Sequence, residues 1–193
     1  MSQPLDTNLQ EPLSDDERKQ REYVDALNAV TDGKLVLLDY EQLRSSLGEP
    51  LMDPMPITTA SQLSDARRNV VNVVRSEFPG FADSQSLINP VGEALNNALK
   101  HGKQATYQVF CLGSAVQVVV SDSGPGIRFR TLPTTRTTTR TGWVAALGMG
   151  FAIMVRLSDR VLVSTEPGRT VVVLEIDMTR RSATRLVKRF SSR

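Results

Sequence analysis

The sequence predicts an α+β fold, a two-layer sandwich in which helices cover one face of a mixed, mostly antiparallel sheet. Two observations carry this prediction. Pairs of apolar runs are separated by short turns typical of β-hairpins, and stretches with helical periodicity lie before and between these pairs. The predicted hairpin strands are Thr106–Cys111 with Ala115–Ser121, and Arg160–Thr165 with Thr170–Asp177.

Composition limits the class of protein. The chain has 193 residues and is 40% hydrophobic, which suits one domain with an extension. Its formal charge of +2 gives no argument for nucleic acid as a partner. Cys111 is the one cysteine, so an intramolecular disulfide is excluded. With no apolar run long enough to span a bilayer and no signal-peptide core, we expect a cytoplasmic protein without a membrane partner.

The first part of the chain is predicted to be an extension. Residues 1–13 are polar and expected to be disordered, and residues 14–53 form a helical N-terminal extension. Within it we expect a helix at 15–30, a short strand at 34–39 and a second short helix at 40–47. The proline-rich stretch 49–56 is a linker or an extended edge. The extension is either an arm for dimerisation or partner docking, or a segment that packs on the domain.

The main domain is predicted to span residues 54–178. A first strand at 56–59 precedes a long helix, which Pro79-Gly80 ends. A second helix follows, and Pro90 suits its first turn.

This second helix carries a polar stripe. Glu93, Asn97 and His101 recur every four residues and therefore share one helix face. An amide oxygen is a hard ligand that suits Mg²⁺ held together with substrate phosphates. A carboxylate one turn earlier can polarise a hydroxyl beside that metal. The alternative is an ordinary solvated helix face.

Two glycine-containing segments follow at a distance. Asp122 ends an apolar run and precedes Ser123-Gly124-Pro125-Gly126-Ile127, where its carboxylate can accept a hydrogen bond from an exocyclic amine such as that of adenine. The alternative is a tight turn capped by an aspartate. Further on, Gly148-Met149-Gly150 opens a helix, and helix N-termini offer free N–H groups to phosphate.

The order and spacing of these three motifs resemble the ATP-binding domain shared by DNA gyrase, ninety-kilodalton heat-shock chaperones, histidine kinases and MutL, the GHKL superfamily with the Bergerat fold. The likeness covers roughly residues 54 to 177. Within the superfamily the chain is most similar to bacterial anti-sigma-factor serine kinases and related switch-protein kinases. Arg156-Leu157-Ser158-Asp159 and Gly168-Arg169-Thr170 are similar to the closing motifs of those kinases.

The resemblance implies ATP and Mg²⁺ as cofactors and a role for each motif. Glu93 is the implied catalytic base, Asn97 the Mg²⁺ ligand, and a site that requires both Asn97 and Asp122 must have them facing one space. The implied nucleotide-binding residues are Asn97, His101, Asp122, Gly124, Gly126, Ile127, Gly148, Met149, Gly150 and Thr170. Two departures stand out: Phe151 replaces a leucine, and Arg169 separates Gly168 from Thr170.

Two segments have no predicted regular structure. Residues 128–144 are threonine-rich and lie where the related kinases keep a mobile lid, so Arg136 and Arg140 are candidates for phosphate contact. The alternative is a disordered loop. The tail 179–193 is basic, and it either solubilises the chain or contacts an anionic partner.

Three functions are compatible with these observations. The first is an ATP-dependent serine/threonine kinase of the anti-sigma-factor type, which regulates transcription by phosphorylating a STAS-like antagonist. The second is a module that sequesters a sigma factor, with nucleotide as an allosteric ligand. The third is a stand-alone catalytic domain of a two-component system. His101 is the only histidine, so a phosphate-accepting histidine would have to come from another protein. The resemblance also allows a homodimer.

Overall fold

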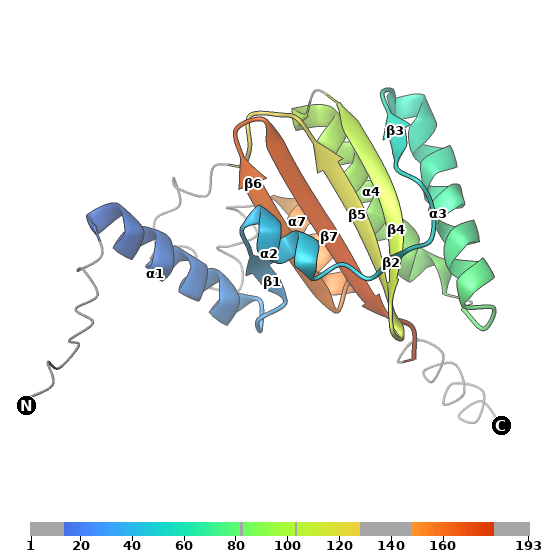
Figure 1. Cartoon of the computed structure of the whole chain (residues 1–193), viewed down its shortest axis with the longest axis horizontal. Coiled ribbons are helices and arrows are strands. Elements are labelled where there is room, and N and C mark those ends of the chain that lie inside the picture. The colour runs from blue at the N-terminus through green and yellow to red at the C-terminus, as the bar shows by residue number, and fades with distance from the viewer. Residues whose placement is uncertain (1–13, 82, 103, 128–147, 180–193) are drawn as a thin grey trace, which may run out of the picture.

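The computed structural model describes residues 14–81, 83–102, 104–127 and 148–179. A seven-stranded sheet runs through the domain in the order β1-β6-β7-β5-β4-β2, and β3 also pairs with β4 (Figure 1). Only β1 is parallel to its neighbour; the other pairings are antiparallel. The strands are β1 Leu35–Leu37, β2 Glu49–Pro50, β3 Met55–Ile57, β4 Ala105–Leu112, β5 Ala115–Asp122, β6 Arg160–Glu166 and β7 Arg169–Asp177.

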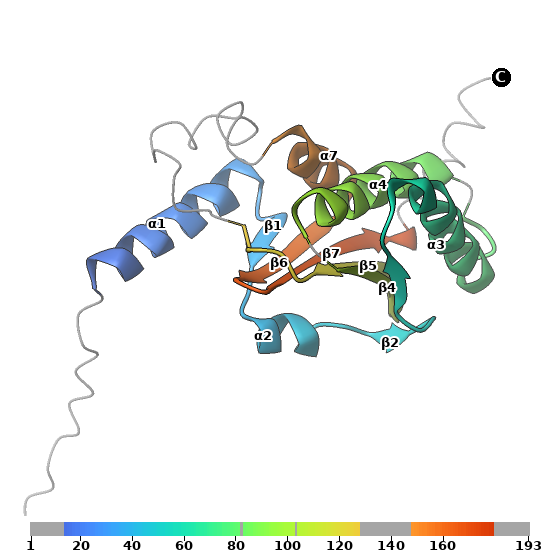
Figure 2. The ribbon, with the colours of Figure 1, turned by 90° about the horizontal axis from the view of Figure 1, so that it is seen from above.

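One face of the sheet is covered by a layer of helices. Figure 2 shows α4 between α3 and α7 above the strands. The described helices are α1 Asp15–Val30, α2 Tyr40–Ser45, α3 Leu63–Glu77, α4 Ser84–His101 and α7 Met149–Leu157, with a single 3₁₀ turn at Ala60–Gln62. The predicted α+β class is confirmed. The short α2 lies on the opposite face of the sheet, which the prediction of helices on one face did not include (Figure 2).

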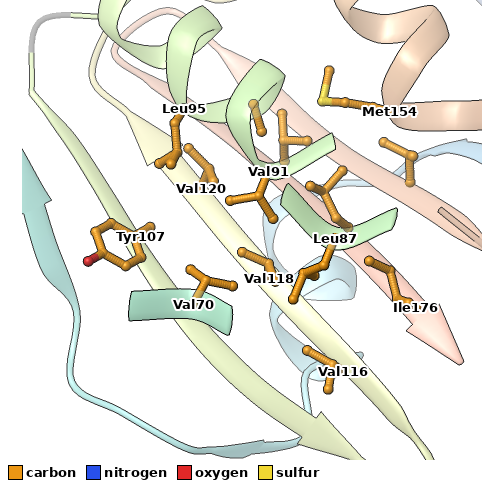
Figure 3. Packing of buried hydrophobic residues seen from close by; sticks show 14 of the residues in the cluster. Val70, Leu87, Val91, Leu95, Tyr107, Val116, Val118, Val120, Met154 and Ile176 are labelled. Atoms are coloured by element: carbon orange, nitrogen blue, oxygen red, sulfur yellow. The ribbon is translucent and has the colours of Figure 1, made fainter. Parts of the chain in front are cut away.

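The core lies between the helix layer and the sheet. In Figure 3 the side chains of Leu87, Val91 and Leu95 point from α4 toward Val116, Val118 and Val120 of β5, and all six are buried. Alternation along β5 puts these valines on one face, and the spacing of the α4 residues puts them on one helix stripe. Burial of this stripe fixes the orientation of α4 on the sheet, so the opposite stripe of α4, with Glu93, faces away from the core.

Helix α4 begins earlier than predicted. Asp83 is its N-cap, and its Oδ1 accepts a hydrogen bond from the backbone N–H of Ser86. Pro90 therefore lies inside the helix rather than in its first turn, and that prediction is wrong. Proline removes one backbone hydrogen bond at this position. Pro90 is buried, and its contact with the core offsets part of that cost.

The N-terminal extension packs on the domain. Strand β1 adds to the sheet beside β6 through the register Leu35↔Val161 to Leu37↔Val163. On the other face, Leu43 of α2 packs with Leu162, Val171 and Val173. The fully buried amide of Gln117 then holds the following loop, because it accepts from the N–H of Gly48 (2.9 Å) and donates to the carbonyl of Ser46 (3.0 Å). Of the two predicted roles for the extension, packing on the domain is the one observed from residue 34 onward.

Several predictions lie outside the described residues. They are the disorder of residues 1–13, the lid at 128–144 with Arg136 and Arg140, and the basic tail beyond Thr179. Among the helices that the structure describes, none has the length and apolarity needed to cross a membrane.

If α2 belongs to the folded domain, Leu43→Ala must destabilise the whole domain. The side chain is 1% exposed, and truncation of a buried leucine to alanine costs about 2–5 kcal/mol. We expect a loss in that range in urea denaturation followed by circular dichroism. Leu112→Ala, at a side chain 45% exposed at the end of β4, is the matched control and should cost less than about 1 kcal/mol. Equal values for the two variants would show that α2 is only loosely attached.

Candidate nucleotide site

A pocket of about 440 Å³ opens between α4, the start of α7 and the adjoining ends of β5 and β7. Its walls are mainly apolar, with buried side chains such as Val120, Phe151 and Met154. Its polar groups come from residues that the sequence singled out. Six of the predicted site residues line it: Asn97, His101, Asp122, Gly126, Ile127 and Thr170.

Asn97 and Asp122 face this same space although they lie on different elements. The end of α4 and the end of β5 are in direct contact, and glycines make that contact possible. A Cβ on Gly102 would lie 2.4 Å from the Cβ of Asp122, and one on Gly124 would lie 2.5 Å from the carbonyl oxygen of His101. No other residue type fits at either position without a shift of the backbone. Asn97 and Asp122 therefore face one space, as a site that requires both residues demands.

Asp122 is a half-buried carboxylate at the base of the pocket. Its Oδ1 accepts a hydrogen bond of 2.8 Å from the N–H of Gly124. No donor among the described residues reaches Oδ2, so this oxygen is available to a ligand. Burial raises the pKa of Asp122 above its ordinary value, while the Gly124 hydrogen bond and the nearby His101 act in the opposite direction. The pocket thus contains an acceptor that is only partly satisfied by the protein.

A chain of hydroxyl groups shapes the wall opposite α4. Thr170 pairs with Asp122 in the β5–β7 register, and its Oγ1 lies 3.1 Å from Oγ1 of Thr165. Thr165 Oγ1 also accepts from the N–H of Ile127 at 2.8 Å. Sequence reasoning missed Thr165; its position opposite Thr170 in the predicted second hairpin was the available signal.

Gly126 completes this wall. Its φ of +83° lies in the region that favours glycine, and a Cβ there would be 3.0 Å from the Glu166 carbonyl group. Gly124, also predicted, is buried rather than pocket-lining. It supports the loop, because its N–H bonds Asp122 and its carbonyl accepts from the N–H of Gly168 at 2.8 Å.

The second glycine segment lies at the N-terminus of α7. Gly148 is the N-cap with φ of +87°, and the first helical bond runs from the N–H of Ala152 to its carbonyl. The N–H groups before Ala152 have no acceptor within the helix, and they form the positive end of its dipole. Gly148 and Met149 are exposed and do not line the pocket. Gly150 lies against α4: a Cβ there would be 2.9 Å from Glu93 Oε2 and 3.3 Å from Asn97 Nδ2.

Two residues differ from expectation in their placement. Glu93 does not line the pocket; it lines a separate groove on the outer side of the helix layer, and it reaches the start of α7 at Gly150. Lys100, which the sequence analysis did not select, lines the pocket three residues after Asn97. Residues three apart share a helix face, so the predicted polar stripe was the signal that pointed to it.

The sequence profile described as the histidine kinase-like ATPase domain matches residues 56–176. The chain belongs to this family. It is therefore an ATP-binding domain of the histidine kinase-like class, and the matched segment runs from β3 to β7 with the whole pocket inside it. No curated protein matches the chain.

Two solved structures are similar to this chain over most of its length. The Acinetobacter baumannii histidine kinase AdeS is similar over 82% of this chain and 76% of its own, with 12% identity and a TM-score of 0.39. The histidine kinase domain of the Erythrobacter litoralis EL346 blue-light activated histidine kinase is similar over 86% and 77%, with 15% identity and a TM-score of 0.41. At these values we draw no functional conclusion from either.

The pocket suits the nucleotide of this ATPase family. Its size lies within the range of small-molecule sites, its walls are mainly apolar, and no described residue donates to the Asp122 Oδ2, which can therefore accept from an amine. Among the described residues no cluster of three or more histidine, cysteine or acidic side chains forms a ready metal cage. A single amide at Asn97 is the ligand pattern of Mg²⁺ that is bound mainly through phosphates and water.

The burial of Asp122 makes a prediction about pH. Because its folded pKa is raised, the folded state loses stability relative to the unfolded state as the pH rises from the unfolded value near 3.8 to the folded value. Asp122→Asn removes this cost. We expect the nucleotide-free variant to be more stable than the wild type at pH 7 in urea denaturation, by a difference that shrinks as the pH falls toward 3.8. A difference that is constant with pH would contradict the assignment.

The same substitution should weaken nucleotide binding, because an amide presents only one acceptor and lacks the charge. A hydrogen bond to a charged group contributes about 1.5–3 kcal/mol, so we expect ATP affinity to fall about 10- to 100-fold in isothermal titration calorimetry. Asp53→Asn, at an exposed position outside the pocket, is the control for loss of one charge. Unchanged ATP affinity in Asp122→Asn would place the adenine elsewhere.

Proposed function

We propose that the protein is an ATP-dependent serine/threonine protein kinase of the anti-sigma-factor type. One observation carries the proposal: Glu93 and Asn97 come together at Gly150, where the N-terminus of α7 begins. A candidate base, a candidate Mg²⁺ ligand and a helix end with free N–H groups thus converge at one point.

Each group has a distinct part in the proposed reaction. Asp122 and Thr170 hold the purine, and the first N–H groups of α7 face the terminal phosphates. Asn97 holds Mg²⁺, which neutralises phosphate charge when bound. Glu93 takes the proton of a serine or threonine hydroxyl as that oxygen replaces ADP on the terminal phosphorus. Most of the rate enhancement then comes from positioning and charge stabilisation.

The proposed substrate is another protein, a STAS-like antagonist of an anti-sigma factor, and a sigma factor is the proposed sequestered partner. Support comes from the motif likeness to the switch-protein kinases and from His101, which is the only histidine of the chain and lies at the end of α4 beside Asp122. A phosphohistidine intermediate on this chain would require a histidine that is not part of the nucleotide pocket. A homodimer is a further part of the proposal, because the resemblance to these kinases allows one.

The test is incubation of the protein with magnesium and ATP labelled in its terminal phosphate, together with a lysate of its own cells. A labelled protein whose phosphate survives acid supports phosphorylation of serine or threonine. Acid-labile label would instead assign the chain to a two-component system. Nucleotide binding without any labelled protein would favour a partner-sequestering module.

Glu93→Gln separates chemistry from binding. The amide keeps the shape of the side chain but cannot accept the proton, and loss of a general base costs about 10²- to 10⁴-fold in rate. We expect phosphoryl transfer to fall by that factor while ATP affinity changes less than about threefold, because Glu93 lies outside the nucleotide pocket. Glu77→Gln, on the exposed side of α3, is the matched control. Undiminished transfer in Glu93→Gln would exclude Glu93 as the base.

A further inference from the structure

The groove that contains Glu93 crosses the outer side of the helix layer. It has a volume of about 540 Å³ and is built from α3, α4 and α7, which lie next to one another in Figure 2. Leu63 of α3 and Ile153 and Leu157 of α7 give it an apolar part. None of the nucleotide-binding roles uses these residues, so the groove is available for a different ligand.

The groove also contains two arginines that form no ion pair with any described acidic residue. Arg67 of α3 donates to the carbonyl of Leu63 and, at 3.5 Å, to the hydroxyl of Ser64. Arg156 of α7 is exposed. No described carboxylate, Glu93 included, lies within ion-pair distance of either guanidinium. By contrast, Arg68, Arg160 and Arg169 each form an ion pair with a neighbouring acid. Arg67 and Arg156 thus form no ion pair with the described part of the chain, and they outnumber Glu93, the one acidic residue among the described residues that line the groove.

Gly92 determines the path of Arg67. A Cβ on Gly92 would lie 3.2 Å from both Cδ and a terminal nitrogen of Arg67, so the arginine side chain crosses α4 where that helix has no side chain. Glycine inside a helix is unfavourable relative to alanine. Its presence one residue before Glu93 leaves room for the guanidinium on the α4 surface, in the same groove as Glu93 but without an ion pair to it.

The groove and the nucleotide pocket approach each other at one place. Glu93 lines the groove, Asn97 lines the pocket, and both side chains contact the position of Gly150 at the start of α7. A ligand in the groove would thus reach the candidate base from the side opposite the purine.

We propose that this groove docks the acceptor segment of the protein substrate, a segment with a carboxylate and an apolar side chain near its serine or threonine. This inference rests on the proposed kinase function. The carboxylate pairs with Arg67 and Arg156, the apolar side chain packs on Ile153 and Leu157, and the hydroxyl is delivered to Glu93. Charge complementarity commits the groove to an acidic protein segment, and guanidinium groups match carboxylates in a paired geometry.

The experiment is a nuclear magnetic resonance titration of isotope-labelled protein, loaded with magnesium and a non-hydrolysable ATP analogue. The probes are short peptides with a central serine, a leucine and a pair of aspartates at varied positions, and the same peptides with asparagines. We expect the aspartate peptides to shift the backbone amide signals of Gly92, Asn96, Ile153 and Leu157. The asparagine peptides should bind about tenfold more weakly, and added salt should reduce the difference.

Charge reversal tests the assignment of the arginines. Arg156→Glu should weaken binding of the aspartate peptides about tenfold or more. Arg75→Glu, the same change on an exposed part of α3 outside the groove, should leave binding unchanged. Gly92→Ala is a second variant: alanine favours the helix, so the fold is retained while Arg67 is displaced and binding weakens. Normal amide spectra of all three variants establish that they are folded.

Three outcomes would overturn the proposal: equal binding of aspartate and asparagine peptides, equal affinities of Arg156→Glu and Arg75→Glu, or shifts confined to another surface. Peptide binding is measured without phosphoryl transfer, so the two proposals fail separately. A protein that binds the acidic peptides in the groove but labels no substrate contradicts the kinase function. One that labels its substrate equally well with Arg156→Glu contradicts the groove.

Discussion

The contact between the end of α4 and the end of β5 is the constraint on which the rest of the site depends. Gly102 and Gly124 have no side chains, so the end of α4 comes close to Asp122. Asn97 of α4 and Asp122 of β5 can therefore line the same pocket. The burial of α4 on β5 through residues such as Val91 and Val118 holds this contact in place. Apolar packing thus fixes the distance between two polar groups that are far apart in the sequence, and the polar groups contribute little to the stability of the arrangement themselves.

A residue outside the segment that the family profile matches also holds an element of the site in place. The start of α7 lies against Glu93 and Asn97 of α4, and the other end of α7 is held by Lys34, whose Nζ donates to the carbonyls of Ser158 (3.0 Å) and Val155 (3.4 Å). A cation at a helix C-terminus also has a favourable interaction with the helix dipole. Lys34 precedes β1, which adds to the sheet beside β6. The family profile begins at residue 56, so Lys34 and β1 lie outside the matched segment, yet they pack on the family domain rather than forming a separate arm.

Much of the fold was accessible from the sequence because local patterns determine it. The alternation in β4 and β5 and the turn at Gly113 predicted the first hairpin to within one residue at each strand end, and the periodicity of α4 predicted the helix and its layer but not its start. Pro90 was misplaced because Asp83 caps the helix earlier, and burial of Pro90 offsets part of the cost of the lost hydrogen bond. The pocket-lining role of Lys100 and the hydroxyl contact of Thr165 depend on how α4 and β6 meet their neighbours, which no local pattern encodes. The lid arginines, Arg136 and Arg140, stay predictions.

The polar stripe of α4 contributes to two different cavities, the nucleotide pocket and the groove. Asn97 and His101 turn toward the pocket, whereas Glu93, one turn earlier, turns toward the groove with Arg67 and Arg156. A base that lay inside the purine pocket would be screened from an incoming hydroxyl by the nucleotide itself. Glu93 lies beside Gly150, at the boundary between pocket and groove, and in the proposed reaction this position gives it access to phosphate on one side and to an acceptor on the other. The absence of a side chain at Gly150 keeps that boundary open, since a Cβ there would displace the carboxylate. Helical periodicity thus places Glu93 one turn before Asn97, and the missing side chain of one glycine lets both approach the start of α7.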